Sequence, residues 1–257
     1  MMESVKKGFT LSINALKLFY VLAGTYAVIN IINLILIPAP ANKEMSLGKS
    51  LLVIVLTILF ALIGVFVYGG VLASVKELIK SGSYNISAFV DNAKKYFLPL
   101  LLVSILVLLI FFVVTVLFMV LLGVMPGILK AVFTILMVLA FIALMVLFIF
   151  PGYAVIGSDL GAIEAIKKGF LVSKKNFLRV LGLFGIVVLL AIVVMIVASV
   201  ISGIFFLVLR PLSGAITAII MAIVNAALMI VVSIIYMDFY LKHESDGAGI
   251  VNQAGNQ

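Results

Sequence analysis

Residues 163–183 read IEAIKKGFLVSKKNFLRVLGL, a short basic amphipathic segment that runs directly into a long apolar span. Part of this stretch recurs at the start of the chain, where VKKGF at 5–9 matches IKKGF at 166–170 at an offset of 161 residues. A weaker middle copy, at an offset of 80, aligns Ile86, Lys94, Lys95, Phe97, Leu98 and Leu101 with Ile166, Lys174, Lys175, Phe177, Leu178 and Leu181. A period of this size predicts repeats that each hold a surface helix and two membrane spans.

The composition places the chain in lipid. Hydrophobic residues make up 66% of its 257 residues and charged residues 10%, and the mean hydropathy is +1.46. So little polar surface cannot cover a water-soluble globule. The chain has no cysteine, which excludes disulfides and thiolate metal sites.

Six runs without ionisable residues are each long enough for the roughly 20 apolar residues that cross a bilayer as a helix. The predicted spans are about 18–37, 51–75, 97–122, 131–150, 180–209 and 215–240. The fold class is therefore an all-α polytopic membrane protein with three two-helix repeats, about 4–80, 84–157 and 158–241. A basic amphipathic interfacial helix precedes each pair. The polar tail 242–257 is predicted to be disordered.

Turn and cap residues mark the expected helix ends. Pro99 is expected in the first turn of the third span, where its missing N–H costs little. Gly123-x-x-Pro126-Gly127 predicts a tight hairpin turn between the third and fourth spans. Pro151-Gly152 is expected to end the fourth span, and Ser158 or Asp159 to cap the next helix, whose apolar face should hold Ile163, Ile166 and Phe170.

The distribution of basic residues predicts the orientation. Thirteen of the 17 Lys and Arg residues lie on the side of the two termini and of the connections 2–3 and 4–5. The opposite side holds only Lys43, Lys49, Lys130 and Arg210. By the positive-inside rule, both termini face the cytoplasm of a cell that carries the protein in its cytoplasmic membrane. The net charge of +8 is thereby explained without a nucleic-acid partner.

The same basic residues are the candidate contacts with anionic lipid headgroups on the cytoplasmic side. Each cation near the surface could contribute ~1 kcal/mol. The alternative is that they serve topology alone, and the two roles are compatible. The candidate set is Lys6, Lys7, Lys94, Lys95, Lys167, Lys168, Lys174 and Lys175.

Polar residues within the spans form a second candidate site. Asn30 and Asn33 lie in the first span and Asn225 lies midway along the sixth. Hydrocarbon offers no hydrogen-bond partner, so these amides need one within the protein. One interpretation is a polar pocket, and the other, which we favour, is interhelical hydrogen bonding.

Ionisable residues suggest no reaction centre. Asp238 lies one turn from Lys242 at the end of the sixth span, and an i, i+4 pair is at least as good an interpretation as a site. Asp159 and Glu164 are expected to pair with Lys167 and Lys168, and the single histidine, His243, to be solvated. We find no catalytic set, metal-ligand spacing or phosphate loop, so no enzyme activity, metal or cofactor is expected.

The stretch SDLGAIEAIKKGFLVSKKNFLRVLGL at 158–183, with its echo MESVKKGFTLSINALKLF at 2–19, resembles a broad group of uncharacterised bacterial and archaeal six-span membrane proteins. That group includes the membrane domain attached to some glycerophosphodiester phosphodiesterases. The resemblance implies a fold and a location. It implies no activity, because one histidine and no paired carboxylates cannot supply the catalytic set of such a phosphodiesterase.

Two functional hypotheses remain. The first is a non-enzymatic protein that organises or senses the cytoplasmic membrane, or serves as the partner subunit of another membrane protein or of a second copy of itself. The second is a small-molecule transporter or channel with a pathway between the three helix pairs. A lipid-modifying enzyme is disfavoured by the lack of intramembrane acids and histidine. Access of water to Asn30, Asn33 and Asn225 distinguishes the two hypotheses, because transport requires water there and a packed helix contact excludes it.

Overall fold

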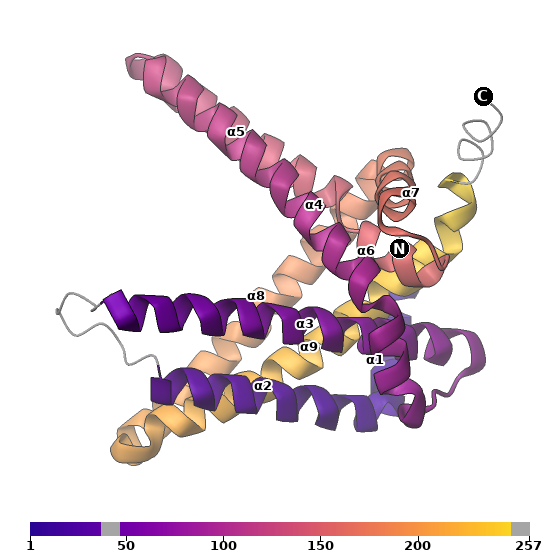
Figure 1. The fold of residues 1–257 in the computed structure, drawn as a ribbon, viewed down its shortest axis with the longest axis vertical. Coiled ribbons are helices and arrows are strands. Elements are labelled where there is room, and N and C mark those ends of the chain that lie inside the picture. Colours follow the sequence, from indigo (N-terminus) through magenta and orange to yellow (C-terminus); the bar gives the residue numbers. More distant parts are fainter. Residues whose placement is uncertain (37–46, 248–257) are drawn as a thin grey trace. The chain divides into compact units, whose positions relative to one another are not determined.

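The computed structural model describes residues 1–36 and 47–247, and every regular element within them is helical (Figure 1). The elements are α1 Met2–Ser12, η1 Ile13–Ala15, α2 Leu16–Leu36, α3 Leu47–Ser81, η2 Ile86–Ala88, α4 Phe89–Val124, α5 Gly127–Leu147, α6 Pro151–Gly157, α7 Ala162–Lys175, α8 Phe177–Val208, η3 Arg210–Leu212, α9 Ser213–His243 and η4 Glu244–Gly247.

Six of these helical segments are long and apolar enough to cross a membrane. They are Met2–Leu36, Leu47–Ser81, Ile86–Val124, Gly127–Gly157, Phe177–Val208 and Ser213–His243. Many large apolar side chains on them point outward, among them Leu108, which is 72% exposed, and Met119, which is 67% exposed. Such surfaces are stable only against hydrocarbon. The predicted number of spans is therefore confirmed for the part of the chain that the structure describes.

The chain divides into two compact units. The first contains Met1, residues 95–185 and the chain from residue 236 onward, and the second contains residues 2–94 and 186–235. The long helices α4, α8 and α9 each contribute to both. The prediction of a single transmembrane domain over 1–241 stays a prediction, and each unit is described by itself.

In the first unit, α4 and α5 form an antiparallel hairpin through the turn at Gly127, whose φ is +45° (Figure 1). Phenylalanine rings pack across this hairpin: Phe118 and Phe133 have ring centroids 5.6 Å apart, and Phe111 and Phe141 6.1 Å. The predicted tight turn is confirmed. Helix α7 contacts α6, α5 and η4.

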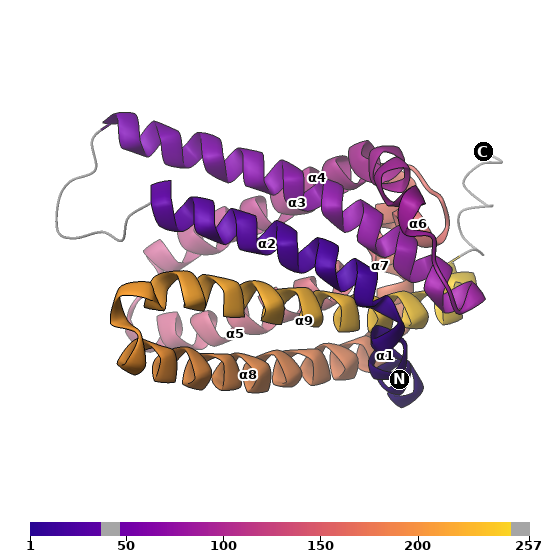
Figure 2. The ribbon, with the colours of Figure 1, turned by 90° about the horizontal axis from the view of Figure 1, so that it is seen from below.

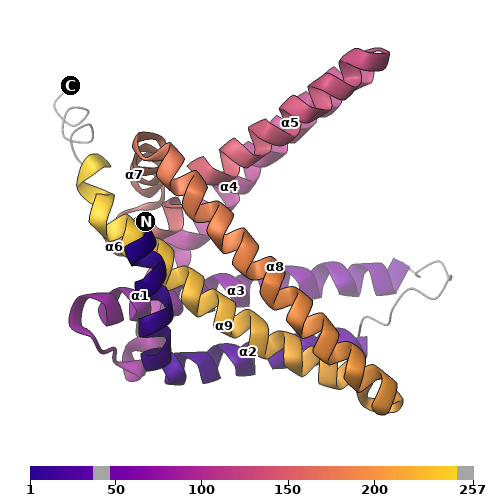
Figure 3. The ribbon, with the colours of Figure 1, turned by 180° about the vertical axis from the view of Figure 1, so that it is seen from behind.

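In the second unit, α2 contacts α3, and α8 and α9 form a hairpin connected by η3 (Figure 2). Helix α1 is separated from α2 by η1 and lies against α9 near Ile235 (Figure 3). Leu18 lies in the first turn of α2, and its backbone N–H donates to the Tyr84 hydroxyl at 3.0 Å. Tyr84 thus fastens the start of α2 to the α3–α4 connection.

Two prolines occupy positions other than those predicted. Helix α4 begins at Phe89, so Pro99 lies in its interior and not in its first turn. Helix α5 ends at Leu147, and Pro151 begins the short helix α6 at a position where its missing N–H costs nothing. The fourth membrane segment therefore continues to Gly157 beyond a turn at residues 148–150.

The end of α9 differs from the predicted tail. Lys242 and His243 belong to α9, and η4 covers Glu244–Gly247. His243 is half-buried: its Nδ1 lies 2.9 Å from the Phe239 carbonyl oxygen, and its ring stacks on Phe239 with centroids 4.3 Å apart. The prediction of a solvated His243 is wrong, because the helix continues and supplies both contacts. The rest of the predicted tail, residues 248–257, lies outside the described residues.

Helix α7 approaches the start of α6 closely at Gly169, and a substitution there tests this contact. A Cβ at this position would lie 2.5 Å from the Pro151 backbone nitrogen and 2.7 Å from the Phe150 carbonyl carbon, and backbone atoms cannot rotate away. We expect Gly169→Ala to lower stability by about 1–3 kcal/mol through overpacking. The measurement is the thermal unfolding midpoint of the detergent-solubilised protein.

Gly185→Ala is the matched control, because no atom lies within 4 Å of a Cβ built there. Alanine in a helix interior should be neutral or stabilising by up to about 1 kcal/mol. Equal midpoints for the two variants would contradict the close approach of α7 to α6.

Candidate functional site

Residues at both ends of helix α7 favour its start and its end. Gly161 precedes it in extended conformation, Glu164 lies in its first turn, and Lys174 and Lys175 lie in its last turn. Acid at the start and base at the end both complement the helix dipole. The predicted cap is wrong: Ser158 ends α6, and Gly161 stands at the start of α7.

Small side chains form the packing face of α7. Ala165, Gly169, Val172 and Ser173 are buried, and α7 packs against α6. The larger apolar residues face outward, with Ile163 64% exposed and Ile166 partly exposed. The predicted apolar packing face is therefore only partly correct. Of its three residues, Phe170 makes the ring contact, with Phe148 at 5.7 Å.

Helix α1 shows the same arrangement 161 residues earlier. Ser4 and Gly8, which match Ala165 and Gly169, are buried. A Cβ on Gly8 would collide with the Ile235 side chain and lie 3.3 Å from the Val231 carbonyl oxygen of α9. Large apolar residues again point outward: Phe9 of α1 is 47% exposed, and directly after this helix Ile13 of η1 is 69% and Leu16 of α2 56% exposed. Both helices thus dock through small residues and leave bulky apolar side chains free.

The predicted middle copy has no surface helix separate from its membrane span. Its helix α4 runs from Phe89 to Val124 without a separate surface helix. Phe89 is buried and lies where a Cβ on Gly70 of α3 would fall 2.7 Å from its ring. The close approach is retained here with the partners exchanged: the glycine lies on the span and the large residue on the docking segment.

The eight candidate lysines fall into two groups. Lys6, Lys94, Lys167 and Lys174 are exposed. Lys95 makes an ion pair with Asp159, with Nζ and Oδ1 2.9 Å apart, and Lys168 donates to the Ser158 hydroxyl at 2.8 Å. Lys7 and Lys175 also have interactions within the chain. The expected pairing of Asp159 with Lys167 or Lys168 is wrong, because α4 brings Lys95 to it.

Ser158 is the centre of a polar network that the sequence did not reveal. Its hydroxyl accepts from Lys168, lies 2.8 Å from the Tyr240 hydroxyl and donates to Glu244 at 3.1 Å. A hydroxyl has one donor and two acceptor sites, so these contacts satisfy it fully. The network therefore joins the end of α6 to α7, α9 and η4, and leaves Ser158 no free site for a substrate.

The chain turns directly after Ser158. Asp159 adopts a left-handed conformation with φ +55°, and the Leu160 N–H donates to the Val155 carbonyl at 3.1 Å. This is the helix ending that glycine usually supplies. Asp159 tolerates it as a short polar residue, and its carboxylate is held by Lys95.

Asp238 makes the predicted i, i+4 ion pair. Its Oδ2 lies 2.9 Å from the Nζ of Lys242, and its side chain is only 2% exposed. The carboxylate is therefore enclosed by protein, among the buried residues Met237, Phe239 and Tyr240 of the last turns of α9. A buried carboxylate requires such a partner.

The three asparagines have different surroundings. The Asn30 amide donates to the Ala218 carbonyl at 3.0 Å and links α2 to α9. Asn33 and Asn225 are both partly exposed. The nearby Tyr26 hydroxyl contacts Met229 Sδ at 2.7 Å, a second link between the same helices. These contacts favour the interhelical interpretation.

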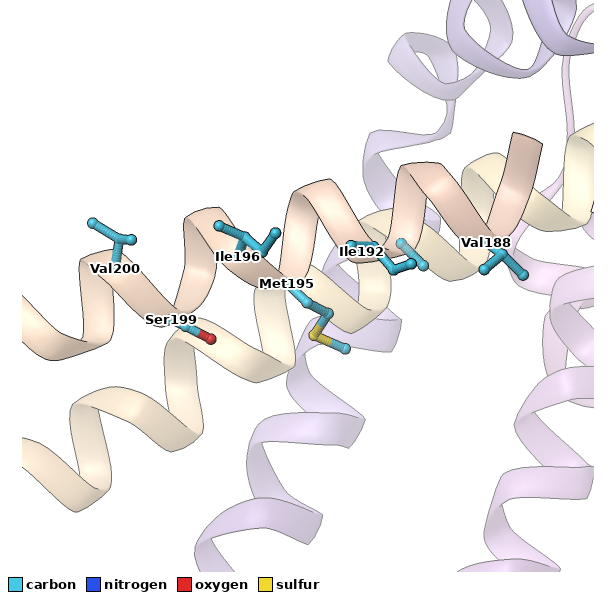
Figure 4. Close-up of a pocket in the computed structure, with 7 residues that line it drawn as sticks. Val188, Ile192, Met195, Ile196, Ser199 and Val200 are labelled. Carbon is cyan, nitrogen blue, oxygen red and sulfur yellow. The ribbon is translucent and has the colours of Figure 1, made fainter. Parts of the chain in front are cut away.

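An open groove of about 530 Å³ runs along α8, lined by Val188, Ala191, Ile192, Met195, Ile196, Ser199 and Val200. Figure 4 shows Met195 and Ser199 on one side of this helix and Ile196 and Val200 on the other. Ser199 is the only polar residue in the lining. Within residues 1–36 and 47–247, no group of three or more His, Cys, Asp or Glu residues could hold a metal ion.

Taken together, the six long apolar helices define a polytopic helical membrane protein. Residues 10–242 match the family model of a domain of unknown function, DUF7847, and the chain belongs to that family. No curated protein and no solved structure matches the chain. The resemblance to the membrane domain attached to some phosphodiesterases stays a prediction.

Ser158→Ala should destabilise the protein by about 1–3 kcal/mol, because it leaves part-buried groups of Lys168, Tyr240 and Glu244 without their shared partner. The thermal unfolding midpoint in detergent measures the change. Ser245→Ala removes an exposed hydroxyl nearby and should have no effect. Equal midpoints would show that the network adds nothing to stability.

Single cysteines at Asn33 and Asn225 test the asparagine region, because the natural chain has no cysteine. We expect no reaction with a membrane-impermeant thiol reagent from either side, since packed helices exclude water. Control cysteines at Lys130 and Lys174 should react from opposite sides of the membrane. Labelling at both asparagine positions would instead reveal a water-filled pathway.

Proposed function

We propose that the protein is a non-enzymatic component of the cytoplasmic membrane that organises or senses the bilayer through its basic surface helices. The main support for this proposal is that α1 and α7 pack on the protein in the same way. Both dock through small buried residues and turn large apolar side chains and lysines outward. Helices that combine exposed apolar and cationic residues lie in the interface between headgroups and acyl chains.

The proposal includes three repeats, 4–80, 84–157 and 158–241. Burial recurs at the offsets that the sequence motifs show. At an offset of 80, five pairs are buried in both copies: Phe89 and Gly169, Ala93 and Ser173, Tyr96 and Asn176, Leu100 and Val180, and Val103 and Leu183. At an offset of 161, Gly8, Ala15 and Leu22 match Gly169, Asn176 and Leu183 in the same way.

The docking partners recur as well. The first helix of each copy meets the second span of another copy near Gly70, Pro151 and Val231. These positions are 81 and 80 residues apart in the sequence. Equivalent contacts at equivalent spacings are expected when one unit has been repeated three times. The repeat thus accounts for why the surface helices share one orientation on their spans.

Both termini and the basic helices are assigned to the cytoplasmic side. The support is the excess of Lys and Arg there and the exposure of Lys6, Lys94, Lys167 and Lys174. The inner leaflet carries anionic lipids that attract such residues. A partner subunit or a second copy of the chain remains compatible with this role. The Asn30 contact with Ala218 argues against the alternative, a transport pathway through this region.

A tryptophan at Ile163 would report the depth of α7, because the natural chain has no tryptophan. In vesicles, we expect the fluorescence of Ile163→Trp to be quenched most strongly by lipids brominated near the headgroup. Leu108→Trp, at a site midway along α4 that is 72% exposed against 64% for Ile163, should be quenched most by lipids brominated near the chain ends. Quenching of Ile163→Trp by an aqueous quencher alone would place α7 outside the membrane and overturn the proposal.

A further inference from the structure

The corner between α7 and α8 holds an arginine in a defined place. Asn176, which is 8% exposed, separates the two helices. Its backbone N–H and its side-chain Nδ2 both donate to the Val172 carbonyl at 3.2 Å. Its Oδ1 accepts a long hydrogen bond, 3.5 Å, from Nη1 of Arg179. The buried amide thus ends α7 and offers the exposed guanidinium an acceptor.

Positive charge gathers at this corner. Lys174 and Arg179 are exposed, and Leu178 beside them is 78% exposed. The only acidic residue of α7, Glu164, lies in its first turn, at the opposite end. The nearest acid in the preceding loop, Asp159, is engaged by Lys95. The corner therefore combines cations with an apolar side chain free to enter hydrocarbon.

The other two copies lack this combination. At an offset of 161, Ile13, Ala15 and Leu18 stand where Lys174, Asn176 and Arg179 stand here. At an offset of 80, the corresponding residues are Lys94, Tyr96 and Pro99. All three copies keep the docking geometry, so docking does not require the Asn176 and Arg179 pair. Its presence in one copy needs a separate explanation.

We propose that the α7–α8 corner is a binding site for the phosphate of an anionic phospholipid. Arg179 contacts phosphate oxygens through its planar guanidinium, Lys174 adds a second cation, and Leu178 lies among the acyl chains. Asn176 is a positioning residue that orients Arg179. The inference rests on the proposed interfacial location of α7, and it deepens that proposal by naming the lipid class and the residues.

Native mass spectrometry of the detergent-solubilised full chain tests the site by counting bound lipids during titration with phosphatidylglycerol or phosphatidylcholine. The natural sequence should bind phosphatidylglycerol saturably and phosphatidylcholine weakly. Arg179→Gln should weaken phosphatidylglycerol binding at least about five-fold, the equivalent of one interfacial cation. Lys174→Gln should weaken it by a similar factor.

Arg210→Gln is the matched control, because Arg210 is an exposed arginine beyond the other end of α8 and should leave the affinity unchanged. Inorganic phosphate at equal concentration should not compete, because it lacks acyl chains. Equal affinity of the Arg179→Gln and natural chains, equal binding of the two lipids, or competition by free phosphate would each overturn the site. The depth measurement at Ile163 is independent of lipid charge, so failure of the interfacial location can be told from failure of this site.

Discussion

Polar groups in the membrane-spanning helices must find partners within the protein, because hydrocarbon offers none. The hydroxyls of Thr25, Ser104 and Thr115 donate to the carbonyl four residues earlier, at 2.8, 2.8 and 2.7 Å. The Asn30 side chain extends to α9, where the Ala218 carbonyl accepts a hydrogen bond from its amide. The constraint also explains Asp238, whose carboxylate is enclosed by protein and paired with Lys242. The three hydroxyls and Asp238 thus find partners within their own helices, Asn30 joins α2 to α9, and apolar side chains are left to face the lipid.

Close approach at glycine is the second determinant of the arrangement. Because Gly8 and Gly169 have no side chain, α1 and α7 lie directly on the helices beneath them. A helix held this closely cannot rotate to bury its larger side chains, and Phe9 of α1 and Ile163 of α7 consequently remain exposed. The outward orientation of the large apolar side chains on α1 and α7 therefore follows from how these helices pack on the protein and not from their amphipathicity alone.

The spans were predictable from sequence because charge-free length is sufficient to identify them. Helix ends near proline were not. Pro99 was expected at a helix start, yet Phe89 and Ala93 are buried and extend α4 backward beyond it. The prediction that His243 is solvated was wrong for a similar reason, because α9 continues past the apolar run and includes this residue. Tertiary burial decided these boundaries, and local composition could not report it.

The site was only partly predictable, since the surroundings of a lysine depend on residues distant in sequence. Ser158 joins Tyr240 and Glu244, which are 82 and 86 positions away, and no local pattern connects them. The pairs at 94–95 and 167–168 are both Lys-Lys in sequence, yet Lys95 and Lys168 have partners within the protein while Lys94 and Lys167 are exposed. One member of each pair thus bonds to another part of the protein while its neighbour stays exposed. Adjacent lysines of one pair therefore have different surroundings, and the local sequence does not distinguish them because their partners lie elsewhere in the chain.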